Sequence, residues 1–93
     1  MSNSPGPRVQ VALPASLTAP GAAEELPCEA GTVSDLLDAV AAARPALAGR
    51  LLYEGRPLVS VILNGVVLAA QAAMATPLAD GDRVELVPPV AGG

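Results

Sequence analysis

The sequence predicts an α+β domain in which one main helix packs across a mixed sheet of about four or five strands. Three observations support this prediction. Segments with alternating apolar residues open and close the chain, one amphipathic segment with a capping signal lies between them, and an Asn-Gly pair marks a tight hairpin. The 93 residues have the length of a single domain.

Two strands are expected before the helix. In residues 9–13, Val9, Val11 and Leu13 alternate with other residues, which is the pattern of a strand with one buried face. Residues 14–23 contain two prolines and a glycine and predict a turn or loop. Residues 24–29 predict a second strand antiparallel to the first, and Pro27 restricts this strand to a sheet edge.

The main helix is expected to begin at Thr32. This residue is a good N-cap, and Asp35 lies three positions further, which resembles a capping box with Asp in place of Glu. Positions 33, 36, 37, 40 and 43 are apolar and fall on one helical face. Arg44 is expected in the last turn, where a cation suits the helix dipole, and Pro45 ends the helix.

The second half predicts three strands. Residues 46–52 form a short helical turn before a corner at Glu54-Gly55, and residues 59–63 form the strongest strand. Asn64-Gly65 predicts a type I′ hairpin, from which residues 66–68 return antiparallel. Residues 71–78 are a connection.

The last strand follows a tight turn at Asp80-Gly81-Asp82 and covers residues 83–87. Val84 and Leu86 fall on one face of it, and Arg83, Glu85 and Val87 fall on the other. The resulting order β-β-α-β-β-β is that of a ubiquitin-like β-grasp domain.

The amino-acid composition limits the classes of function that the chain can have. The chain is 52% hydrophobic with Tyr53 as its single aromatic residue, so we expect a core of Val, Leu, Ile and Ala. The net charge of −4 argues against nucleic acid or an anionic membrane as a partner. One Cys and no His leave no catalytic triad, no Cys/His metal cluster and no imidazole base, so we expect a non-enzyme without a metal or cofactor of its own.

Location is predicted to be cytoplasmic. Cys28 has no partner for an intramolecular disulfide, as is usual in a reducing compartment. The start is rich in Ser, Pro and Gly without the apolar run of a signal peptide, and no apolar stretch reaches the length of a membrane span. We divide the chain into a disordered leader (1–7), the domain (8–87) and a flexible tail (88–93).

The tail has properties that suit chemistry at its end. Two prolines stiffen its root, and the segment from Pro88 onward can reach roughly 20 Å from the domain. Gly92 and Gly93 have no side chains, so the tip can enter a narrow channel. A carboxylate on such an arm can be presented to the active site of another protein.

Several motifs together resemble the MoaD/ThiS sulfur carriers, over about residues 8–93. They are Gly31-Thr32-Val33 before a Leu-rich helix, Val61-Ile62-Leu63-Asn64-Gly65, Thr76-Pro77-Leu78, Asp80-Gly81-Asp82 and the ending Pro88-Pro89-Val90-Ala91-Gly92-Gly93. The ending is the most specific of them.

The resemblance implies a function for the terminal residues. In that family an E1-like adenylyltransferase activates the C-terminal glycine with ATP and Mg²⁺, and a persulfide donor then supplies sulfur to form a thiocarboxylate. Gly93 is by resemblance the sulfur-carrying residue, and Gly92 is its flexible neighbour. A sulfur-accepting synthase is the further partner. The ATP belongs to the activating enzyme.

The resemblance also implies a partner interface. Its expected residues are Val67, Val87, Pro88, Pro89, Val90 and Ala91. Ordinary sheet packing is the alternative explanation for the two valines. Arg83 has two interpretations as well, either a contact with the partner or a position on a solvated face beside Glu85.

Other reactive groups have simpler explanations. Asp80 and Asp82 flank Gly81 and are expected to form the turn rather than a catalytic pair. Cys28 is expected to be a half-buried structural thiol, because no basic residue adjoins it in the sequence to lower its pKa.

Four functions stay open. The tail most resembles that of the small subunit of molybdopterin synthase, which predicts sulfur donation to molybdopterin. The segment 11–17 is somewhat similar to carriers for cysteine, thiamine or other sulfur-containing metabolites. A ubiquitin-like modifier attached to target lysines would share the fold and tail. A β-grasp binding module with an inert tail is the fourth.

Overall fold

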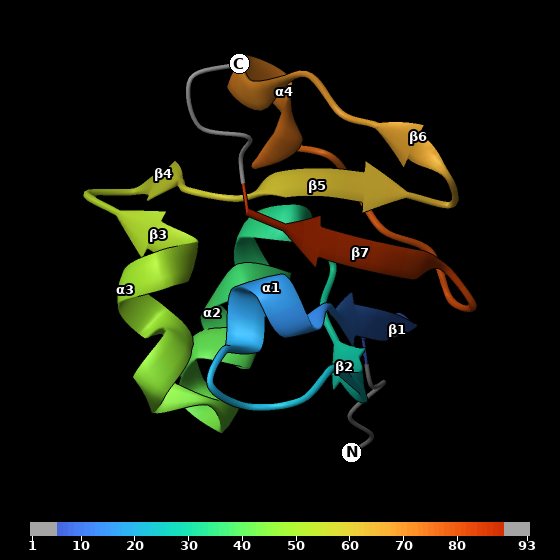
Figure 1. Ribbon diagram of the computed structural model, residues 1–93. Helices are drawn as coiled ribbons and strands as arrows, with labels where there is room; N and C mark the ends of the chain where they lie inside the picture. Colours follow the sequence, from blue (N-terminus) through green and yellow to red (C-terminus); the bar gives the residue numbers. More distant parts are fainter. Residues whose placement is uncertain (1–5, 89–93) are drawn as a thin grey trace.

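A five-stranded mixed sheet is the central element of residues 6–88, the part of the chain that the computed structural model describes (Figure 1). Its strand order is β2-β1-β7-β5-β6. The strands are β1 (Arg8–Leu13), β2 (Glu24–Glu29), β5 (Ser60–Leu63), β6 (Val66–Val67) and β7 (Arg83–Val87). The prediction of about four or five strands is confirmed, as is the edge position of β2.

Strand β7 occupies the middle of this sheet. It pairs in parallel with β1, with Val84 opposite Val11, and antiparallel with β5, with Leu86 opposite Val61. In Figure 1, β7 (red) lies between β5 (yellow) and β1 (dark blue). Both of its backbone edges are therefore hydrogen-bonded, and the last strand of the chain cannot shift without breaking two ladders.

The main helix, α2 (Val33–Ala43), forms where the sequence predicts it. The Thr32 hydroxyl oxygen accepts a hydrogen bond from the Asp35 backbone N–H at 3.2 Å, so this half of the predicted capping arrangement is confirmed. The buried face of α2 consists of Val33, Leu36, Leu37 and Val40. These residues pack on the sheet and supply much of the core.

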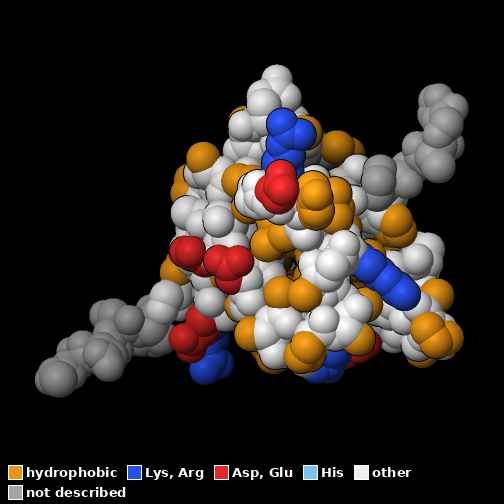
Figure 2. All heavy atoms as spheres, turned by 90° about the vertical axis from the view of Figure 1, so that its left-hand side faces the viewer, with side chains coloured by type: hydrophobic (Ala, Val, Ile, Leu, Met, Phe, Trp, Pro, Cys, Tyr) orange, Lys and Arg blue, Asp and Glu red, His pale blue; other side chains and the backbone are white. Residues whose placement is uncertain are grey.

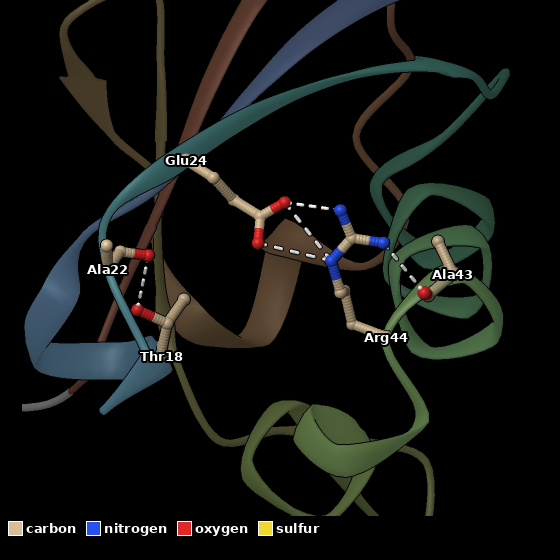
Figure 3. A network of polar contacts seen from close by, with 5 residues as sticks. All are labelled: Thr18, Ala22, Glu24, Ala43 and Arg44. Atoms are coloured by element: carbon tan, nitrogen blue, oxygen red, sulfur yellow. Dashed lines mark hydrogen bonds and ion pairs between the residues drawn. The ribbon is translucent and has the colours of Figure 1, made fainter. Parts of the chain in front are cut away.

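Arg44 lies one residue beyond α2, at its C-cap, rather than in the last turn as predicted. Its guanidinium forms a forked ion pair with Glu24 on β2, and its Nη1 donates to the Ala43 carbonyl at 2.9 Å (Figure 3). Hydrogen bonding to Arg44 lowers the pKa of Glu24 below its usual value. The pair joins the end of the helix to the edge strand.

The segment predicted as a turn or loop contains a one-turn helix, so this prediction was wrong, and the predicted connection before the last strand contains another. Helix α1 (Ala15–Thr18) lies within 14–23, and α4 (Ala70–Ala73) begins the segment assigned to 71–78. Each buries one apolar side chain, Leu17 in α1 and Ala73 in α4. A single turn is too short to give a helical periodicity in the sequence.

The segment between α2 and β5 contains four short elements. They are the 3₁₀ helix η1 (Pro45–Leu47), α3 (Ala48–Leu51), β3 (Leu52–Tyr53) and β4 (Arg56–Pro57). The predicted helical turn is confirmed, and the predicted corner at Glu54-Gly55 is the turn of a two-stranded hairpin made by β3 and β4. This hairpin was not predicted.

The core is entirely aliphatic. Every buried residue described is Val, Leu or Ala, and none of them is polar or charged. The predicted contribution of isoleucine is wrong, because Ile62 is only half-buried and faces away from α2. Within residues 6–88, no helix has the length and hydropathy needed to cross a membrane.

A network of hydrogen bonds fixes the start of β7. The Asp82 carboxylate accepts from the Ala79 backbone N–H at 2.8 Å and from the Asn64 side-chain amide at 2.9 Å. The Asn64 side-chain carbonyl in turn accepts from the Arg83 backbone N–H at 2.9 Å. Asn64 and Gly65 have φ values of 49° and 85°, as the predicted hairpin turn requires. The β5–β6 turn is thereby tied to the root of the last strand.

Replacing Leu36 by Ala tests the packing of α2 on the sheet. Leu36 is fully buried, and its truncation leaves a cavity, so we expect the free energy of unfolding to fall by about 2–5 kcal/mol. Urea unfolding followed by circular dichroism gives this value. The control is Val66→Ala, at a residue that is 62% exposed, which should change stability by less than about 0.5 kcal/mol.

The Asp82 network predicts a pH dependence. Hydrogen bonds from Ala79 and Asn64 lower the pKa of Asp82 below 3.8. A carboxyl with a lowered folded pKa stabilises the fold above its unfolded pKa, and this stabilisation is lost as the pH falls through the folded value. We therefore expect the difference in unfolding free energy between the wild type and Asp82→Asn to shrink from about pH 5 to about pH 2. Urea unfolding at each pH measures it, and a constant difference would contradict the assignment.

Candidate functional site

The predicted working group lies at the end of the tail. Gly92 and Gly93 lie outside the described residues, as do the predicted interface residues Pro89, Val90 and Ala91. The structure describes the base from which this tail starts. Strand β7 ends at Val87, and the half-buried Pro88 follows it directly.

This base lies next to the side of the sheet that is turned away from α2, here called the open face. Val84 and Leu86 of β7 are fully buried in the core, so the alternating residues Arg83, Glu85 and Val87 point the other way. This alternation confirms the two predicted faces of the last strand. The strand register then adds neighbours from β1, β5 and β6, which are Gln10, Ala12, Ser60, Ile62 and Val67.

The register brings the two predicted interface valines onto the same face. Val87 lies opposite Ser60, and Val67 lies opposite Ile62 two positions along β5. Val67 is 66% exposed, whereas Val87 is half-buried. Ordinary packing does not explain so exposed a valine at position 67. A role for both residues in binding a partner stays a prediction.

Ile62, Ala12 and Glu85 also belong to this face, although sequence reasoning did not select them as site residues. They occupy one row across three strands, with Glu85 between Ala12 on β1 and Ile62 on β5. The alternation of apolar and polar residues in each strand indicates on which face of the sheet each residue lies. The strand order cannot be read from the sequence, and the row of residues across the strands cannot be identified without it.

Arg83 is not simply solvated. Its guanidinium donates to both carboxylate oxygens of Glu25 on β2, at 3.2 Å and 2.9 Å, across the top of β1. These bonds lower the pKa of Glu25 and raise the pKa of Arg83. The side chains are about half exposed, so water screens the pair and its contribution to stability is small.

The other reactive residues lie off the open face. Cys28 of β2 packs against the core, and burial raises the pKa of its thiol, which keeps it protonated at neutral pH. Asp80 accepts a hydrogen bond from the Arg8 backbone N–H at 2.9 Å and belongs to the turn, as predicted. In residues 6–88, no three His, Cys, Asp or Glu side chains are grouped so that they could hold a metal ion.

A second exposed apolar region lies at the end of the molecule where β3 and β4 form their hairpin. Figure 2 faces this end and shows hydrophobic side chains (orange) among a few charged ones. Tyr53 is 62% exposed there, and Leu58 is 37% exposed. Strands β3 and β4 form a two-stranded sheet that does not pair with the five-stranded one.

Comparison with known proteins identifies relatives of this chain. Small archaeal modifier protein 3 from Haloferax volcanii is 47% identical over 64 residues, which cover 67% of this chain and 70% of that protein. A chain of the Amycolatopsis orientalis BexX/CysO complex superposes with a TM-score of 0.75 at 26% identity, covering 91% of this chain and 99% of that chain.

A third relative comes from the complex of subunits 1 and 2 of the molybdopterin-converting factor of Helicobacter pylori. The TM-score is 0.54 at 26% identity, with coverage of 92% of this chain and 99% of that chain. These likenesses confirm the predicted β-grasp fold. The sequence also matches the ThiS family over residues 11–93. The chain therefore belongs to the ThiS family, whose members are small ubiquitin-like sulfur carriers and modifiers.

Proposed function

We propose that this chain is a sulfur carrier whose working group is the carboxylate of Gly93. The observation that supports this most directly is the position of β7. The central strand of the sheet runs into Pro88 and the tail, and an exposed face with apolar residues lies at its root. A partner that binds this face holds the base of the tail at a fixed place, and the tip can then enter the partner's active site.

The chemistry needs no side chain of the carrier. A carboxylate is a poor electrophile, so an E1-like adenylyltransferase first joins it to the α-phosphate of ATP and releases pyrophosphate. The terminal sulfur of a persulfide donor then attacks the acyl-adenylate, releases AMP and forms an acyl disulfide with the donor. A second thiol on the donor side cleaves this S–S bond, forms a disulfide with the donor sulfur and releases the thiocarboxylate, which is a good nucleophile at neutral pH. The carrier binds no cofactor itself in this scheme. ATP and Mg²⁺ belong to the activating enzyme.

Molybdopterin synthesis is the pathway that we propose first. The ending Pro88-Pro89-Val90-Ala91-Gly92-Gly93 supports it by resemblance, as does the likeness to a chain of the Helicobacter pylori factor. The accepting partner is then a large subunit of molybdopterin synthase. Synthesis of cysteine, thiamine or another sulfur-containing metabolite is the alternative. In either case we place the carrier in the cytoplasm, with protein partners rather than nucleic acid or membrane.

Protein modification is a second candidate function. The 47% identical relative is named a small archaeal modifier protein, which favours attachment of Gly93 to lysines of other proteins. The chain has no lysine of its own, so attachment to another copy through a lysine is excluded. Gly-Gly remnants on lysines of digested cell proteins would support this function. A binding module with an inert tail is the remaining alternative.

Intact-mass measurement of the chain from its own cells tests the carrier function. We expect a fraction of the protein to carry the mass increase of one oxygen-to-sulfur exchange, located on the C-terminal peptide by fragmentation so that oxidised Met1 or Met74 is not mistaken for it. Deleting Gly93 or adding one Ala after it should abolish this species. Persistence of the species in either variant, or full biological activity of the Gly93 deletion, would contradict the proposal.

Two adjacent valines test the open face. Val67 lies on it, whereas Val66 is opposite Leu63 on the other face and is almost equally exposed, at 62% against 66%. We expect Val67→Asp to raise the KM of the carrier for its adenylating enzyme by about tenfold, because an apolar contact becomes a desolvated charge. Val66→Asp should change KM by less than about twofold. Pyrophosphate exchange at varied carrier concentration gives both values, and equal effects would rule out this face.

A further inference from the structure

Glu85 occupies the middle of the open face. Its neighbours across the strands are Ala12 and Ile62, and its neighbours on the same face of β7 are Arg83 and Val87. Three of these four are apolar. The Glu85 side chain is half-buried among them.

No residue in 6–88 forms a hydrogen bond or ion pair with the Glu85 carboxylate. Its nearest cation along the strand, Arg83, directs both guanidinium contacts to Glu25, at 3.2 Å and 2.9 Å. Glu85 acts on Arg83 only through space and less strongly than Glu25 does. Glu25 is thus neutralised within the chain, whereas the negative charge of Glu85 is left for solvent.

Covering this face would remove the water that solvates Glu85. A carboxylate taken out of water without a partner strongly opposes binding, whereas one that meets a cation fixes the register of the two surfaces. A carboxylate that has no partner within the chain and three apolar neighbours therefore opposes binding of a partner without a matching cation and favours a partner that has one. A carboxylate of this kind contributes more to the choice of partner than to the strength of binding.

We propose that Glu85 selects the protein that binds the open face, by pairing with an arginine or lysine side chain that this partner presents among apolar residues. The proposal rests on the sulfur-carrier function, and the first such partner is the adenylating enzyme. The matching cation lies within an apolar ring that contacts Ile62, Val67 and Val87. Partners with a neutral or acidic group at this position are rejected.

Steady-state adenylation by the purified adenylating enzyme of the source organism tests the proposal. The full chain is varied in concentration, and pyrophosphate exchange gives KM and kcat. We expect Glu85→Arg to raise KM by about tenfold or more with kcat at saturation nearly unchanged. Glu85→Gln, which keeps the size of the side chain, should give an intermediate rise. The increase for Glu85→Arg should shrink when salt is raised from about 0.05 M to about 0.5 M.

Asp38→Arg is the matched control. Asp38 is exposed on α2, in the layer opposite the open face, and its replacement changes the net charge by the same amount. Its KM should stay within about twofold of the wild type. Thermal unfolding verifies that each variant is folded. If Glu85→Arg does not fold, the KM of Glu85→Gln tests the proposal instead.

The outcomes separate this inference from the function on which it rests. If the wild type is adenylated and the Glu85 variants have the KM of Asp38→Arg, Glu85 has no selecting role and the carrier function stands. If the wild-type chain is not adenylated, the carrier function fails and the selection of this partner fails with it.

Discussion

Pairing of β7 on both of its edges is the constraint on which the other features depend. The parallel ladder with β1 and the antiparallel ladder with β5 hold one strand at the centre of the sheet. Its inward residues, Val84 and Leu86, complete the core beneath α2. Its outward residues form the middle of the open face, and its end is the base of the tail. One strand thus contributes to the core, to the open face and to the base of the tail on which the proposed function depends.

Charged residues differ in whether they form ion pairs within the chain. Arg44 pairs with Glu24 and joins α2 to β2, and Arg83 pairs with Glu25 across β1. Both pairs neutralise carboxylates of the same edge strand. The carboxylate at the centre of the open face has no such partner among the described residues. The described core therefore contains no charged residue, whereas the middle of the open face contains an unpaired carboxylate.

The sequence was sufficient for features that depend on near neighbours in the chain. The N-cap at Thr32, the Asn64-Gly65 turn and the two faces of residues 83–87 follow from local spacing and backbone preference. It was insufficient for features that depend on distant segments. The Arg83–Glu25 pair joins residues 58 positions apart, and the row through Glu85 needs the strand order. One-turn helices such as α1 were missed because they are too short to have a period.

The position of β2 at the edge of the sheet affects whether copies of the chain can aggregate in solution. A chain that is 52% hydrophobic and ends its sheet in an open strand is at risk of edge-to-edge aggregation. Glu24, Glu25 and Glu29 place carboxylates along this edge, and Pro27 removes one backbone donor from it. Charged side chains that need hydration and a missing backbone donor oppose the addition of a second sheet at this edge. At the other edge, β6 is only two residues long, so it offers few backbone groups for pairing with another sheet.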